Sequence, residues 1–163
     1  MLGQDAVVVD VEAVAHAGEP ALNLQGLPRQ AESACRDRVY AATCNSGLVW
    51  PTLRITVTLH PVSLARDTST LDLAVAGSVL AAAGLLPAVE LDTALSLAEL
   101  GLSGAVRPVR NALPMVQAAA DCGASTVIVA PENAAEAAQM NGARVLAPRT
   151  LGELVEQLRS IPH

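Results

Sequence analysis

The feature that most constrains the fold of this sequence is its near lack of aromatic side chains. Phenylalanine is absent, and Trp50 and Tyr40 are the only aromatic residues, although 52% of the 163 residues are hydrophobic. The bulk of the core must therefore come from aliphatic side chains, and the many alanines favour closely packed helices. The same composition argues against nucleic-acid binding by base stacking on an aromatic platform.

The length corresponds to about one domain. A domain of this size buries roughly 70% of the surface that its unfolded chain exposes, so it needs neither disulfides nor a structural metal. The three cysteines, Cys35, Cys44 and Cys122, are an odd number without a CxxC motif. We expect them to be reduced thiols, as is typical of cytoplasmic proteins.

All ten cationic side chains are arginines, and the chain contains no lysine. This excludes a Ser-Lys peptidase dyad, a Schiff base and a P-loop lysine supplied by this chain. The net charge of −6 repels a phosphate backbone on average and argues against independent nucleic-acid binding. Two arginine groups are either solvated faces or contacts to a partner or to phosphate: Arg29, Arg36 and Arg38, and Arg107 with Arg110.

In the first half of the chain, residue periodicity predicts strands at residues 6–14, 20–24 and 54–60. A helix follows Gly26-Leu27-Pro28 and ends at Asn45-Ser46-Gly47, where glycine can adopt the left-handed conformation. Residues 73–83 are nearly all apolar and predict a buried central helix that closes at Gly84. The longest apolar run, residues 79–89, is too short to span a membrane.

In the second half, strands are predicted at residues 94–100, 105–109, 126–129 and 144–146. We expect the first two to form a hairpin through the turn at 101–104. Helices are predicted at residues 114–120 and 132–140, and a last one begins at the capping box Thr150-Leu151-Gly152-Glu153. This alternation indicates a single α/β or α+β domain, with no internal repeat.

Motifs for nucleotide or metal binding are absent from the sequence. Neither GxGxxG nor GxxxxGK[ST] occurs, and His16, His60 and His163 are scattered without metal-ligand spacing. No serine or cysteine lies in a nucleophile elbow. We therefore expect no cofactor, no metal and no P-loop ATP site in this chain.

Asp72 stands where the polar residues 66–70 enter the apolar helix. One interpretation is structural: the carboxylate caps free N–H groups and meets the positive end of the helix dipole. The other is a catalytic position at the mouth of a buried helix.

A series of short motifs extends along most of the chain: Gly26-Leu-Pro28, Glu32-Ser33, Arg36-Asp-Arg-Val39, Asn45-Ser-Gly47, Arg54-Ile-Thr-Val57, Leu71-Asp-Leu-Ala74, Gly101-Leu-Ser-Gly104, Val106-Arg-Pro-Val-Arg110, Leu113-Pro114 and Val129-Ala-Pro-Glu-Asn133. In this order, the motifs resemble the amino-terminal domain of the YifB/ComM family of Mg-chelatase-like AAA+ ATPases. The resemblance covers roughly residues 5 to 160.

The resemblance implies a domain similar to the Lon proteolytic domain, with its ribosomal-protein-like α/β fold. It also implies that an AAA+ module with Walker motifs follows residue 163 and binds ATP and Mg²⁺. Full-length members of this family look like hexameric ring ATPases, and ComM is associated with DNA branch migration during natural transformation. The implied partners are thus the AAA+ module, further copies of the chain and, for the full-length protein, DNA.

Carried onto this sequence, the Lon-like resemblance places Asp72 at the position of the serine nucleophile and Leu113-Pro114 near that of the lysine. A carboxylate without an activating partner forms no useful acyl-enzyme, and neither leucine nor proline accepts a proton. We therefore expect a non-catalytic domain that serves assembly, substrate positioning or coupling. Two alternatives remain: a hydrolase that uses Ser69, Ser78 or a cysteine with an unrecognised base, and a weak DNA-contacting module.

Overall fold

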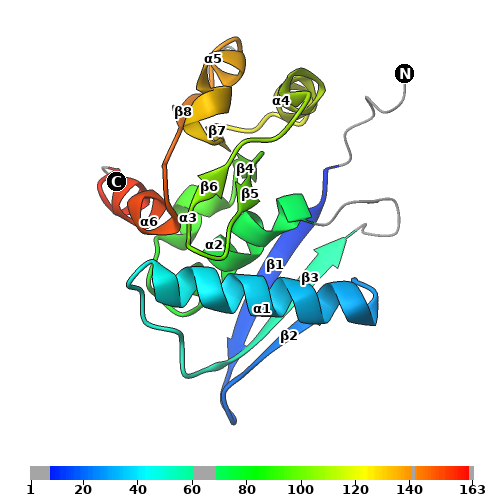
Figure 1. Ribbon diagram of the computed structural model, residues 1–163, viewed down its shortest axis with the longest axis vertical. Coiled ribbons are helices and arrows are strands. Elements are labelled where there is room, and N and C mark those ends of the chain that lie inside the picture. Colours follow the sequence, from blue (N-terminus) through cyan, green and yellow to red (C-terminus); the bar gives the residue numbers. More distant parts are fainter. Residues whose placement is uncertain (1–7, 61–68, 141, 162–163) are drawn as a thin grey trace.

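The computed structural model of the chain describes residues 8–60, 69–140 and 142–161. Its strands are β1 (Asp10–His16), β2 (Ala21–Gln25), β3 (Arg54–His60), β4 (Ala94–Ser96), β5 (Glu99–Leu100), β6 (Val106–Arg107), β7 (Thr126–Ile128) and β8 (Arg144–Leu146). Its helices are α1 (Arg29–Asn45), α2 (Asp72–Ala82), α3 (Ala88–Leu91), α4 (Ala112–Asp121), α5 (Ala134–Ala137) and α6 (Leu151–Arg159), with 3-10 turns η2 (Ser69–Leu71) and η3 (Pro131–Asn133). This is the mixed α+β arrangement that the alternating pattern predicts (Figure 1).

The first sheet has the order β1-β3-β2. β3 runs antiparallel to β1, with Asp10 opposite His60, and parallel to β2, with Ala21 opposite Arg54. Because α1 connects β2 to β3, the two strands can lie parallel and side by side, and β3 separates the consecutive strands β1 and β2. The predicted strand at residues 54–60 is confirmed with the same bounds.

Two helices cover one face of this sheet. The alternating residues Ile55, Val57 and Leu59 of β3 are buried together with apolar side chains of α1 and α2, and Figure 1 shows α1 lying across the strands. Both helices end as predicted at left-handed glycines, Gly47 with φ 76° and Gly84 with φ 78°. One face of the sheet is thus buried while the residues between, such as Thr58, remain exposed.

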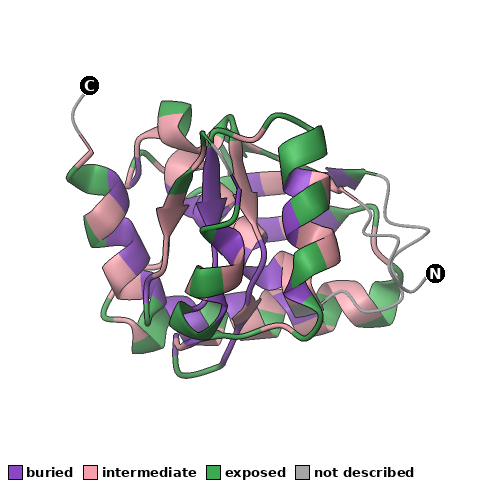
Figure 2. Cartoon of the chain, turned by 90° about the horizontal axis from the view of Figure 1, so that it is seen from above, coloured by how far each residue is buried: buried purple, intermediate pink, exposed green. Residues whose placement is uncertain are grey.

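A second, parallel sheet has the order β4-β7-β8 and is packed by α4 and α5. Val127 and Val129 form a separate apolar cluster with Val116, Ala119 and Ala137. Figure 2 shows buried strands in this part of the molecule between helices whose outward faces are exposed. None of the helices in the described ranges is long and apolar enough to cross a membrane.

Three predicted elements differ from the structure. The predicted hairpin of residues 94–100 and 105–109 is wrong in part. The first segment divides, because Leu97 N–H donates to Ile128 O (2.8 Å) and holds β4 beside β7, and only β5 pairs with β6. The strand predicted at residues 6–14 begins at Asp10 and continues to His16, while residues 6 and 7 lie outside the described ranges.

The helix predicted at residues 132–140 is also shorter than expected. Pro131 begins the 3-10 turn η3, and α5 spans only Ala134–Ala137. At the junction of the two elements, the Asn133 side chain bonds both the backbone of Val109 and the Glu136 side chain of α5. The last helix begins as predicted, since Thr150 Oγ1 accepts a bond from Glu153 N at 3.1 Å.

Candidate functional site

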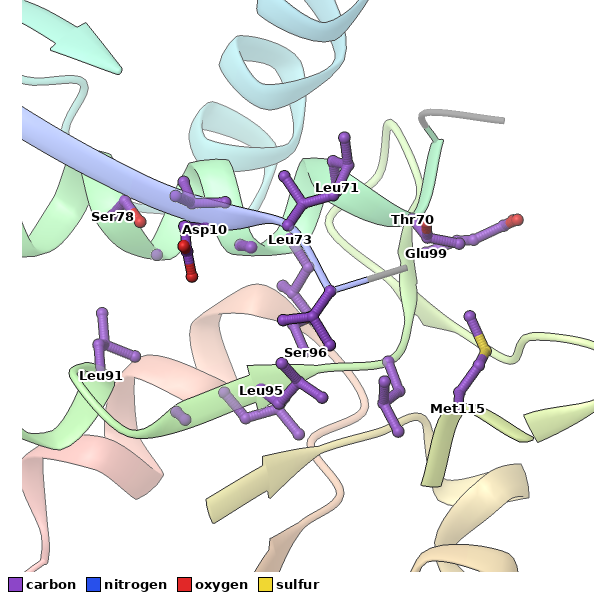
Figure 3. A pocket seen from close by; sticks show the side chains of 18 of the residues that line it. Asp10, Thr70, Leu71, Leu73, Ser78, Leu91, Leu95, Ser96, Glu99 and Met115 are labelled. Atoms are coloured by element: carbon purple, nitrogen blue, oxygen red, sulfur yellow. The ribbon is translucent and has the colours of Figure 1, made fainter. Parts of the chain in front are cut away.

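A groove of about 1520 Å³ runs between the two sheets. Strand β1 borders one side, β4 and α3 border the other, and α2 lines the space between them (Figure 3). Along α2 the lining residues Ala74, Gly77, Ser78 and Ala81 recur at helical spacing and are all small. At these positions the wall of the groove is formed by short side chains, which leave the backbone of α2 close to the surface of the groove.

The predicted site residue Asp72 does not line this groove. Its neighbours Leu71 and Leu73 do, whereas Asp72 is 0% exposed and turns toward α1. Its carboxylate accepts two bonds from Arg38, from Nε at 2.5 Å and from Nη2 at 3.2 Å. Asp72 is the first residue of α2 as expected, and the N-cap position before it is Leu71. The carboxylate of Asp72 forms an ion pair that joins α1 to α2.

Cys35 lies beside this ion pair, one helical turn before Arg38, and is fully buried. Burial raises the pKa of its thiol well above the usual value, and the Asp72 carboxylate adds to the rise through its charge and through the hydrogen bond that it accepts from Sγ. The guanidinium groups of Arg38 and Arg36 oppose the shift. Cys35 is thus a neutral donor to the carboxylate, and this chemistry does not suit a thiolate nucleophile.

The other two positions derived from the resemblance lie at the start of α4. Leu113 is 50% exposed, and Pro114 lines the groove from the first turn of the helix. No proton acceptor is present on either side chain. Pro114 lies on the groove, Leu113 is not among the residues that line it, and Asp72 faces away from it. The structure therefore does not bring the three together into one centre.

Residues 108–111, which precede α4, form a loop at the groove that is held by a side chain the sequence analysis missed. Asn133 is buried and clamps Val109, accepting from its N–H at 2.9 Å and donating to its C=O at 3.2 Å. Asn111 then adopts a left-handed conformation with φ 52°, and exposed Arg110 lines the groove. A polar residue shortly after the buried strand β7 is the signal in the sequence that could have indicated such a contact.

The arginines of the first predicted group point to different places, because two of them make contacts within the domain. Arg36 bonds Glu32 at 2.7 Å and Leu22 O at 3.0 Å, while Arg38 bonds Asp72 from the other side of α1. Arg29 is exposed at the start of the helix. These three guanidinium groups therefore do not form one patch.

The hairpin arginines are exposed. The Arg107 side chain lies over Gly101, where a Cβ atom would meet its Nε at 2.7 Å, and Arg110 reaches the groove. In the ranges that the structure describes, no three His, Cys, Asp or Glu side chains gather as a metal site would require.

The described residues form a mixed α+β domain. A sequence model of the family described as subunit ChlI of Mg-chelatase matches residues 11–133, and the chain belongs to this family. It is 43% identical over 96% of its length to an uncharacterized protein of Mycobacterium tuberculosis. It is 37% identical over 86% to the uncharacterized protein YifB of Escherichia coli, and 33% identical over 96% to the competence protein ComM of Haemophilus influenzae.

The chain spans 31% of the length of the mycobacterial relative and of ComM, and 28% of YifB. The matched region is the amino-terminal part of these longer proteins. The resemblance to the YifB/ComM family, and to its amino-terminal domain, is therefore confirmed.

Proposed function

We propose that this chain is a non-catalytic amino-terminal domain of a Mg-chelatase-like AAA+ ATPase and serves assembly, substrate positioning or coupling. The family match supports the class of the full protein. The observation that carries the non-catalytic role is the ion pair of Asp72, whose side chain is only 1% exposed. A carboxylate with both oxygens bonded to Arg38 and turned away from the groove can neither attack a substrate nor remove a proton from one.

Activity assays on the isolated chain test this role. We expect no hydrolysis of casein and none of ATP. Turnover that follows the protein through a second purification would contradict the proposal.

Serine-reactive and cysteine-reactive probes test the rival, a hydrolase with an unrecognised nucleophile. A fluorophosphonate should leave the folded chain unlabelled, and Ser78→Ala serves as the matched control because Ser78 is the serine of α2 on the groove. Labelling that is lost in this variant, or activity lost on labelling of a cysteine, would establish the rival.

For the full-length protein, we propose that an AAA+ module binds ATP and Mg²⁺ and that the subunits form a hexameric ring in the cytoplasm. The similarity to ComM extends the proposal to DNA branch migration in natural transformation. This chain would then act on the module of the same polypeptide and on neighbouring subunits, with DNA contacted by the assembly.

The exposed arginines provide the test of partner or DNA contact. We propose charge reversal of Arg29, Arg107 and Arg110 to glutamate in the full-length protein, with Arg149→Glu as the control. Arg149 is 78% exposed and pairs only locally, with Glu153, so its reversal should cost little. Arg38 is excluded because its reversal would unpair buried Asp72.

If these arginines contact phosphate, each reversal should reduce the slope of log DNA affinity against log salt concentration by about one. If they contact the ring instead, the charge-reversal variants should assemble more weakly or hydrolyse ATP more slowly than the wild type. If assembly, DNA affinity and ATPase rate are all unchanged, the arginines are a solvated face.

A further inference from the structure

We propose that the groove between the two sheets binds an extended, basic polypeptide segment by addition of a β-strand. This inference goes beyond the function proposed above, because it depends on the groove alone and would hold whether or not the full protein is an ATPase. The ligand that we assign is a segment of another protein, in which arginine or lysine alternates with apolar residues.

The first observation is that two sheet edges border the same groove. β1 is an end strand of the first sheet and β4 an end strand of the second, and residues of both strands line the cavity. An end strand presents unpaired N–H and C=O groups, which a further strand can bond. The seven residues of β1 extend about 23 Å, long enough to pair with five or six residues of a ligand.

The second observation concerns Ser96 on β4. Leu97 N–H donates to β7, and because alternate residues of a strand point in opposite directions, the N–H and C=O of Ser96 point away from β7. The Ser96 Oγ atom is buried and has no hydrogen-bond partner among the described residues. A buried hydroxyl without a partner is costly, and Ser96 lies on the groove (Figure 3), where a polar ligand group would satisfy it.

The third observation is the shape of the surface along α2. The small side chains of Ala74, Ser78 and Ala81 line the groove on the helix side, and Leu91 packs against Gly77, where a Cβ atom would meet its Cδ1 at 3.7 Å. Apolar side chains of Leu91, Leu95 and Met115 line it as well (Figure 3). A ligand strand that bonds a sheet edge with its backbone can therefore direct alternate apolar side chains onto this surface.

Charge determines which segment fits. Exposed carboxylates of Asp10, Glu12 and Asp92 line the groove, opposed by the guanidinium of Arg110, and Figure 3 shows Asp10 directed toward the cavity. This excess of negative charge attracts cationic side chains and repels the phosphates of a nucleic acid. A second copy of the chain, which carries a net charge of −6, is disfavoured for the same reason.

Fluorescence anisotropy with three labelled hexapeptides tests the proposal on the chain as it exists. The first peptide alternates arginine and valine, the second alternates glutamate and valine, and the third repeats the first with alternate backbone amides N-methylated. We expect the first peptide to bind at low ionic strength. The second should bind at least about tenfold more weakly because of charge, and the third at least about fivefold more weakly because a strand cannot pair without its N–H groups.

Charge-reversal variants then locate the binding surface. Asp10→Lys with Glu12→Lys should weaken the arginine peptide at least about tenfold. Glu19→Lys with Asp37→Lys is the matched control: it changes the charge equally at exposed residues that do not line the groove, and it should leave the affinity unchanged beyond a small effect of net charge.

Ser96→Pro tests the sheet edge directly. It should retain pairing with β7, because the N–H that it removes points toward the groove, and it should abolish peptide binding.

Three results would overturn the proposal. The first is no binding of the arginine peptide. The second is that the N-methylated arginine peptide binds as tightly as the unmodified one, which would mean that charge alone attracts the peptide. This comparison uses the wild-type chain, so it does not depend on the folding of any variant. The third is self-association of the chain that is lost in the Asp10→Lys, Glu12→Lys variant, which would assign the groove to a second copy.

Discussion

At the scale of single residues, the contact between Arg38 and Asp72 is the most informative. The Arg38 side chain is 31% exposed and that of Asp72 only 1%. Loss of either partner removes this ion pair from the other, but water can solvate the guanidinium far better than the buried carboxylate. Removal of Arg38 should therefore destabilise the fold more than removal of the Asp72 charge.

This inequality predicts the order of stability among variants. Arg38→Met should lower the free energy of unfolding by about 3–5 kcal/mol, because it leaves a buried carboxylate without its cation, whereas Asp72→Asn should cost about 1–2 kcal/mol. Urea denaturation monitored by circular dichroism measures both values. Equal losses would show that the carboxylate is more accessible to water than the structure indicates.

The cysteines provide a second prediction at this scale. Cys44 and Cys122 are exposed and Cys35 is buried, so a thiol reagent should modify two thiols rapidly and the third only after unfolding. Because burial raises the pKa of Cys35 in the folded state, its neutral thiol contributes stability below the unfolded-state pKa of about 8.5 and loses it at higher pH. Above that pH, stability should therefore fall more steeply in the wild type than in Cys35→Ala. Rapid modification of three thiols in the folded protein would contradict this assignment.

At the scale of elements, each helix end depends on its neighbours in sequence. The Thr150 side chain caps α6 by accepting a bond from Glu153 N. In return, Glu153 Oε1 accepts a bond at 3.3 Å from the N–H of Arg149, the residue before Thr150. The apolar positions Leu151, Leu154 and Leu158 of this helix are buried as the spacing predicts. Both the start and the inward face of α6 could thus be predicted from local rules.

The cap has a measurable effect. Thr150→Ala should lower the free energy of unfolding by about 0.5–2 kcal/mol, and Thr150→Ser should be close to neutral because it retains the hydroxyl acceptor. Thermal unfolding followed by circular dichroism gives both values, with Thr52→Ala, in an exposed loop, as the control. A loss in Thr150→Ser equal to that of the alanine variant would show that packing of the methyl group, and not the cap, stabilises α6.

At the scale of the whole molecule, two apolar clusters of unequal size share the chain. The larger joins the first sheet to α1, α2 and α6, and the smaller lies around β7, α4 and α5. The second sheet lies between them, because Ile128 and Ala130 face the larger cluster and Val127 and Val129 face the smaller one. The smaller cluster has fewer buried residues to hold α4 and α5 in place. The smaller cluster should therefore open more easily than the larger one.

Hydrogen exchange measures this difference. Amides of α4 and α5 should exchange by local opening at a lower free energy than amides of β3 and α2, which should exchange only on global unfolding. Mass spectrometry of peptides from the exchanged protein resolves the two regions. A single common opening free energy for both would show that the chain unfolds as one cooperative unit.

The sequence by itself determined the elements whose signals are local. The alternation of β3, the left-handed glycines after α1 and α2, the capping residue of α6 and the aliphatic character of the core all depend on residues within a few positions of one another. Only the tertiary structure decided that β3 separates β1 from β2, and that residues 94–100 divide between two sheets. It alone also showed that Arg38 meets Asp72 across 34 positions and that two sheet edges border one groove. The reason is physical: hydrogen-bond partners, ion pairs and cavities between distant segments follow from how whole elements pack, and periodicity does not record which surfaces will meet.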